Sequence, residues 1–119
     1  MFVAQAKQIK VCKVRLGQGG LVSGITSGPS VTVSDKDTDI LRHILVSYNS
    51  YETGGHRCGF SPGYKITVIE SEDTMDIFLC YGCHDYIASK GLLFSPERSF
   101  APSAQAIKDI LDRQNLKEP

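Results

Sequence analysis

The residues of this sequence that could do chemistry are thiols and imidazoles, and most of them lie between residues 56 and 84. Three of the four cysteines and two of the three histidines fall in this window: Cys58, Cys80, Cys83, His56 and His84. Such side chains can bind a metal ion, form a disulfide or carry out redox reactions. The window is therefore the candidate site, because the sequence has no Gly-x-Ser-x-Gly elbow and no His-Glu-x-x-His helix.

Three structural interpretations of this window are open. The first is a zinc site with Cys58, Cys80 and Cys83 as ligands and His84 or, alternatively, His56 as the fourth, since tetrahedral zinc takes four such ligands. The second is a disulfide between Cys58 and either Cys83 or Cys80, which an exported protein would favour. The third is that the thiols stay free and pack as small apolar groups.

The fourth interpretation is active chemistry at the run Cys80-x-x-Cys83-His84. These letters match the attachment pattern of c-type haem, although such sites usually begin a helix and no methionine follows this one. A Cys-x-x-Cys pair can also be a redox dithiol when its first sulfur caps a helix. Here the pair ends an alternating, strand-like run, and Gly91 interrupts the segment after it. Both features disfavour catalysis.

The elements that must position this window follow from the spacing of apolar residues. Alternation predicts a strand over 8–16, with a bulge where the apolar positions change parity between Val11 and Cys12, and a short strand over 31–33 after a loop from 17 to 30. Ser34 is a suitable helix cap, with Asp37 three residues later. The helix that it opens has one apolar face, formed by Ile40, Leu41, Ile44, Leu45 and Tyr48.

Two alternating runs, 64–70 and 75–81, flank a polar break and predict an antiparallel hairpin. With a turn at 71–74, Glu70 would pair with Met75 and Ile66 with Leu79. Continuing this count places Tyr64 opposite Tyr81 and Pro62 near Cys83. A bend at Pro62–Gly63 would then bring Cys58 towards Cys80 or Cys83.

The chain is predicted to end in a third strand and a second helix. The strand would begin at Ile87 or Gly91 and end at Phe94. The helix would run over about 102–114, with four residues facing inward: Ala104, Ile107, Ile110 and Leu111. We therefore expect a single α+β domain over 1–119, an antiparallel sheet of three to five strands packed against two helices. The expected core also contains Ile66, Val68, Ile77 and Leu79.

Charge and hydropathy limit the partners that this domain can have. Lys plus Arg and Asp plus Glu are 13 each, so the net charge is zero, which argues against binding nucleic acid or an anionic membrane surface. No apolar run approaches the roughly 18 residues of a membrane span. We expect a cytoplasmic protein. The alternative is the periplasm, if a signal sequence lies upstream, since Ala4-Gln5-Ala6 fits the small-x-small cleavage rule.

The stretch from Arg57 to Gly91 resembles a set of small bacterial proteins of unestablished activity. The likeness consists of a Cys-x-Phe-x-Pro start, two strands and a Cys-x-x-Cys end, matched here by Cys58, Phe60, Pro62, Cys80 and Cys83. It extends loosely to the flanking helices and covers about two thirds of the chain. The resemblance implies the fold and no activity, and the segment around Cys12 has no counterpart in it.

These observations favour a non-enzymatic binding module of bacterial origin. Its partner would be another protein, as for an inhibitor or immunity-type protein, and the Cys/His cluster would be structural. The alternative function is a thiol redox or zinc-dependent activity at Cys58, Cys80 and Cys83. Zinc is the one cofactor that the sequence suggests.

Overall fold

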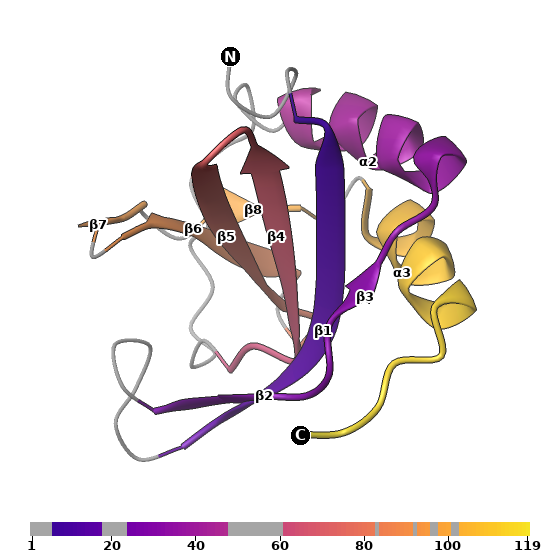
Figure 1. Ribbon diagram of the computed structural model, residues 1–119. Helices are drawn as coiled ribbons and strands as arrows, with labels where there is room; N and C mark the ends of the chain where they lie inside the picture. The colour runs from indigo at the N-terminus through magenta and orange to yellow at the C-terminus, as the bar shows by residue number, and fades with distance from the viewer. Residues whose placement is uncertain are drawn as a thin grey trace.

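The computed structural model describes residues 6–17, 24–47, 61–82, 84–91, 93–95, 98–100 and 103–119. They form an α+β fold with two helices and an eight-stranded antiparallel sheet in the order β2-β1-β4-β5-β6-β7, with β3 also on β1 and β8 also on β6. Both helices cover the same face of the sheet (Figure 1). The expected class and helices are confirmed, but the sheet has more strands than the three to five predicted.

Four longer strands make the centre of the sheet: β1 (Gln8–Leu16), β4 (Tyr64–Glu70), β5 (Asp73–Cys80) and β6 (Asp85–Lys90). Four strands of two or three residues border it: β2 (Ile25–Ser27), β3 (Val31–Thr32), β7 (Leu93–Phe94) and β8 (Arg98–Ser99). Strands this short contain too few residues to show an alternating pattern, so β2 and β8 were not predicted, whereas β3 was. The strand predicted from Ile87 or Gly91 to Phe94 is two strands, β6 and β7, on either side of Gly91.

The predicted bulge in β1 is wrong. Six consecutive residues of β1 pair in unbroken register with β4. The apolar residues change parity because the two halves of the strand bury opposite faces: Ile9 and Val11 join the core under the helices, whereas Cys12 and Val14 are buried outside that cluster. The extra residue lies instead in the segment between β2 and β3, which runs beside β1. There, the three residues 28–30 stand opposite only two residues of β1, Cys12 and Lys13.

The β4–β5 hairpin is shifted by two residues from the predicted register. Its turn contains Ser71 and Glu72 alone, so Glu70 pairs with Asp73, Ile66 with Ile77 and Tyr64 with Leu79. Ser71 takes a φ of 52°, and a positive φ at this position is typical of the tight turns that match the twist of a hairpin. Because the shift is even, every side chain keeps its predicted face.

The helix α2 (Asp35–Ser47) begins where Ser34 predicts it. The amide of Asp37 donates a 3.3 Å hydrogen bond to Ser34 Oγ, which satisfies one of the free donors of the first turn. Leu41 and Leu45 are buried against the sheet. Ile40 was expected in the core, but it is 37 % exposed, since one residue rotates the side chain about 100° around the helix.

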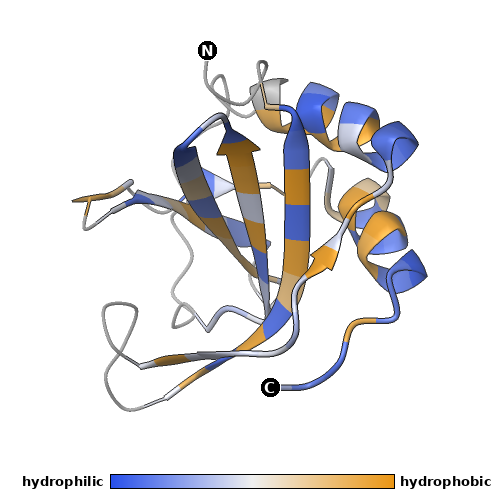
Figure 2. Ribbon diagram, in the orientation of Figure 1, coloured by the Kyte–Doolittle hydropathy of each residue, from blue (hydrophilic) through white to orange (hydrophobic). Residues whose placement is uncertain are grey.

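The helix α3 (Ala104–Arg113) closes the core on the same face of the sheet (Figure 2). Its four predicted inward residues, Ala104, Ile107, Ile110 and Leu111, are all buried. They meet Ile66, Val68, Ile77 and Leu79 of the central hairpin, whose burial is also confirmed. Within the part of the chain described, no helix is long and apolar enough to cross a membrane.

Candidate functional site

The predicted Cys/His site falls only partly on described residues. Cys58, Cys83 and His56 lie outside them, so the proposed ligand set of Cys58, Cys80, Cys83 and His84 or His56 stays a prediction. Of its members, the structure places Cys80 as the last residue of β5 and His84 in the turn that leads to β6. Among described residues, Cys80 and Cys12 are free thiols, and no three Cys, His, Asp or Glu side chains form a metal site.

Cys80 and His84 have different environments although they flank one turn. Cys80 is 2 % exposed, and its backbone lies opposite that of Asp85, whose side chain is fully buried and was not predicted as part of a site. His84 is exposed and has a φ of 55°, a conformation that histidine tolerates better than most side chains. A thiol that works as a nucleophile needs partial exposure. Cys80 therefore has the burial of a packed thiol in this structure.

Cys12 occupies a comparable position on β1. It is 1 % exposed and lies on the sheet face opposite the helices. Phe78, which is also buried on this face, stands in the same cross-strand row as Cys12, with Lys65 of β4 between them. The two described cysteines thus contribute apolar volume to the second face of the sheet.

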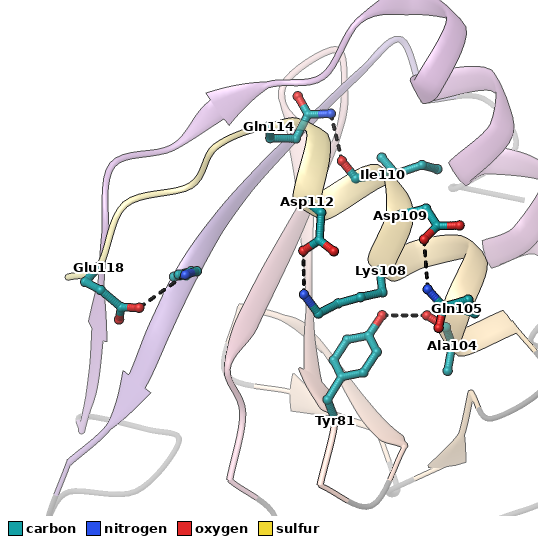
Figure 3. Close-up of polar contacts among 10 residues, drawn as sticks. Tyr81, Ala104, Gln105, Lys108, Asp109, Ile110, Asp112, Gln114 and Glu118 are labelled. Atoms are coloured by element: carbon teal, nitrogen blue, oxygen red, sulfur yellow. Dashed lines mark hydrogen bonds and ion pairs between the residues drawn. The ribbon is translucent and has the colours of Figure 1, made fainter.

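An aromatic cluster connects the His84 turn to α3. The ring of Tyr81 meets Tyr64, His84 and Phe100 edge to face, with centroids 5.7, 5.9 and 5.0 Å apart respectively. The Tyr81 hydroxyl donates a 2.9 Å hydrogen bond to the carbonyl of Ala104 in the first turn of the helix (Figure 3). Burial, followed by the charges of Tyr64, Asp112 and Asp109, raises the pKa of Tyr81 above its ordinary value. A neutral phenol that holds two elements together is a structural group.

Leu93, the most exposed large apolar side chain of the described residues, belongs to the β6–β7 hairpin, which we define as residues 85–94. Among described residues, the large hydrophobic side chains that are most exposed are Leu93 at 79 %, Phe94 at 37 % and Ile40 at 37 %. The first two are adjacent on β7, and this hairpin extends beyond the rest of the sheet, on the side away from the helices (Figures 1 and 2).

Hydrogen bonds between Ser95 and Ala88 fix the backbone of this hairpin. The amide of Ser95 donates to the carbonyl of Ala88 at 2.7 Å, and the Ser95 hydroxyl accepts from the Ala88 amide at 2.9 Å. Gly91 supplies the turn with a φ of 64°. Leu93 stands opposite Lys90 and Phe94 opposite Ser89, so the two apolar side chains point to opposite sides of the ribbon.

The sequence did not predict this hairpin as a site, because residues from Ile87 or Gly91 to Phe94 were predicted only as a strand of the sheet. The signal was the apolar run of residues 92–94 directly after Gly91. In a strand of two residues at a sheet edge, such a run cannot bury every side chain. No family model, no curated protein and no solved structure matches the chain, so the site is interpreted from its own geometry.

Proposed function

We propose that the protein is a small non-enzymatic binding module of the inhibitor or immunity type, and that it binds its partner protein through the β6–β7 hairpin. The observation that carries this proposal is the exposure of Leu93 and Phe94 on an otherwise well-bonded ribbon. Singly scattered apolar residues are normal on a protein surface, whereas here two adjacent ones are exposed on one protruding hairpin.

The geometry of the ribbon favours a partner with a groove. Leu93 and Phe94 lie on opposite sides of β7, so a narrow apolar groove with two walls could cover both side chains at once. The hydrogen bonds of Ser95 to Ala88 hold the ribbon in shape before binding, which lowers the entropic cost of ordering it. The expected partner surface is therefore apolar at its centre and accommodates a leucine and a phenylalanine side chain.

The test compares two equivalent substitutions on different faces. Leu93→Asp and Ile40→Asp each replace an exposed apolar side chain by a carboxylate, the first on β7 and the second on α2. Both variants and the wild type are immobilised and incubated with extract of the source organism, and retained proteins are identified and quantified. We expect one protein to be retained in near-equal amount by the wild type and Ile40→Asp and to be lost from Leu93→Asp.

If the chain is an inhibitor or immunity protein, the retained protein should also have an activity that the chain suppresses. Stoichiometric addition of the wild type should suppress the activity of the purified partner, and Leu93→Asp should not. Melting curves must show that both variants stay folded. Equal retention by all three chains would overturn the proposed surface, and turnover of a substrate by the purified chain alone would overturn the non-enzymatic assignment.

A further inference from the structure

A polar cleft lies between α3 with the residues that follow it and the strands β1 and β4. Its volume is about 170 Å³, and its polar lining comes from Lys13, Tyr64, Lys108, Asp112 and Asn115. Leu111 and Leu116 supply its apolar wall. A water molecule needs roughly 10–15 Å³ of space for its centre, so the cleft has room for a side-chain group of several heavy atoms.

Most of the polar groups in the cleft can donate hydrogen bonds. The ammonium groups of Lys13 and Lys108, the Tyr64 hydroxyl and the Asn115 amide are donors, whereas the Asp112 carboxylate only accepts. Figure 3 shows Lys108 Nζ bonded to Asp112. The same nitrogen lies 5.5 Å from the centre of the Tyr64 ring. The hydrogen bond that Lys108 donates to Asp112 raises the pKa of Lys108, so its ammonium is charged at neutral pH. The lining thus carries two ammonium groups and one carboxylate, and this surplus of one positive charge favours an anionic group.

The chain places a carboxylate of its own against one of these lysines. Glu118 Oε1 lies 3.2 Å from Lys13 Nζ, and Glu118 Oε2 lies 3.9 Å from Arg15 Nη2. The Glu118 side chain is 67 % exposed. An ion pair this exposed contributes little to stability, so another carboxylate could displace it at little cost.

The backbone holds Glu118 in this place. Asn115 has a φ of 53°, which ends α3 and turns the chain back towards β1. The segment 116–119 then passes Gly28 so closely that a Cβ on that residue would lie 2.4 Å from the carbonyl oxygen of Lys117. Glu118 is thus a carboxylate presented by an irregular, non-helical peptide segment at the border of a cationic cleft.

We propose that the cleft binds a Glu or Asp side chain from an acidic peptide segment of a partner protein, and that Glu118 occupies the Lys13 part of this site until the partner arrives. The charge of the lining supplies the complementarity, and Glu118 shows that a carboxylate on a passing peptide chain reaches Lys13. This site is separate from the β6–β7 hairpin, so the inference does not depend on the function proposed above.

The test uses the full chain and a peptide that repeats residues 116–119, acetyl-Leu-Lys-Glu-Pro-amide. The peptide is titrated into isotope-labelled wild type and into Glu118→Gln, and amide shifts are followed by NMR, which detects weak binding. We expect shifts centred on Lys13, Tyr64 and Asn115. Removing the internal carboxylate should tighten binding by about two- to fivefold, which corresponds to an exposed ion pair. A peptide with Gln in place of Glu should produce no shifts.

Matched variants separate this site from general electrostatic attraction. Lys13→Gln and Lys108→Gln should weaken peptide binding several-fold, whereas Lys36→Gln, an exposed lysine on α2, should leave it unchanged. Leu93→Asp should also leave it unchanged, so that the two proposals fail separately. Equal weakening by Lys36→Gln, no gain in Glu118→Gln, or equal binding of inorganic phosphate at the same amides would each overturn the acidic-peptide site.

Discussion

Arg113 Nη2 donates a 2.6 Å hydrogen bond to Asp37 Oδ1, and this ion pair ties the last turn of α3 to the first turn of α2. Asp37 is 8 % exposed and also lies 3.4 Å from Gln114 Nε2. The bond to Asp37 raises the pKa of Arg113. Each residue also suits the dipole of its own helix, since Asp37 lies near a positive amino end and Arg113 near a negative carboxyl end.

We expect Asp37→Ala to lower the free energy of unfolding by up to about 1 kcal/mol, because it removes the acceptor that Arg113 and Gln114 share, and water can replace that acceptor only in part. Urea denaturation measures the change. Asp35→Ala is the control, since Asp35 lies in the same first turn of α2 and is exposed. Equal losses in the two variants would mean that the dipole contribution of α2, rather than the link to α3, accounts for the effect.

Tyr81 should make the fold sensitive to alkali. Because burial raises its pKa, the folded chain keeps the phenol proton at a pH where the unfolded chain, with a pKa of about 10, has lost it. Stability from this group is therefore fully present below about pH 10 and falls as the pH rises further. We expect Tyr81→Phe to remove that fall while costing about 1 kcal/mol at neutral pH through the lost bond to Ala104.

The measurement for Tyr81 is urea unfolding at a series of alkaline pH values. The ultraviolet absorbance of phenolate in the folded protein provides a second readout, because the wild type should show one late-titrating tyrosine that Tyr81→Phe does not. Identical titration curves for the two proteins would contradict the predicted pKa shift.

Cys12 and Cys80 should be unreactive until the chain unfolds, because they are 1 % and 2 % exposed. A thiol reagent with and without denaturant counts the protected groups, and intact mass under native and denaturing conditions distinguishes bound zinc, a disulfide, covalent haem and free thiols. If Cys80 is a zinc ligand, Cys80→Ser releases the metal and Cys12→Ser, an equally buried substitution, retains it. Bound zinc that both variants retain would remove Cys80 from the ligand set.

Two glycines form a matched pair that tests the β6–β7 turn. Gly91 has a φ of 64° and Gly63 has no positive φ, and a Cβ at either would meet no atom within 4 Å. We expect Gly91→Ala to lower the free energy of unfolding by about 1 kcal/mol through backbone strain. Gly63→Ala should be neutral or slightly stabilising, since alanine restricts the unfolded chain. Thermal and urea unfolding would report both, and equal effects would contradict a strained turn.

The regular elements of this fold could be predicted from the sequence because local patterns determine them. The alternation over Gln8–Leu16 predicted β1 with its observed bounds, and Ser34 predicted the start of α2. The register of the β4–β5 hairpin could not be predicted, because polar Asp73 and Thr74 resemble turn residues although they pair with Glu70 and Ile69. Pairing of this kind depends on the twist of two strands and not on side-chain hydropathy.

The candidate sites were less predictable. The cysteine pattern identified a window, but sequence spacing could not show that Cys80 would be buried beside Asp85. The exposure of Leu93 depends on β7 lying at the end of the sheet order, and the cleft beside Lys13 depends on the path of residues 116–119 after α3. Each follows from tertiary contacts between segments that are distant in the chain.

The short bordering strands limit how this protein can assemble. β2 and β3 together occupy the outer side of β1, and β7 and β8 with Ser95 occupy that of β6, so neither central strand offers a long row of unpaired backbone groups in the part described. Strand-by-strand extension into fibres or swapped dimers is thereby disfavoured. A partner that approaches this sheet should therefore contact protruding side chains such as Leu93, and not unpaired backbone groups of the central strands.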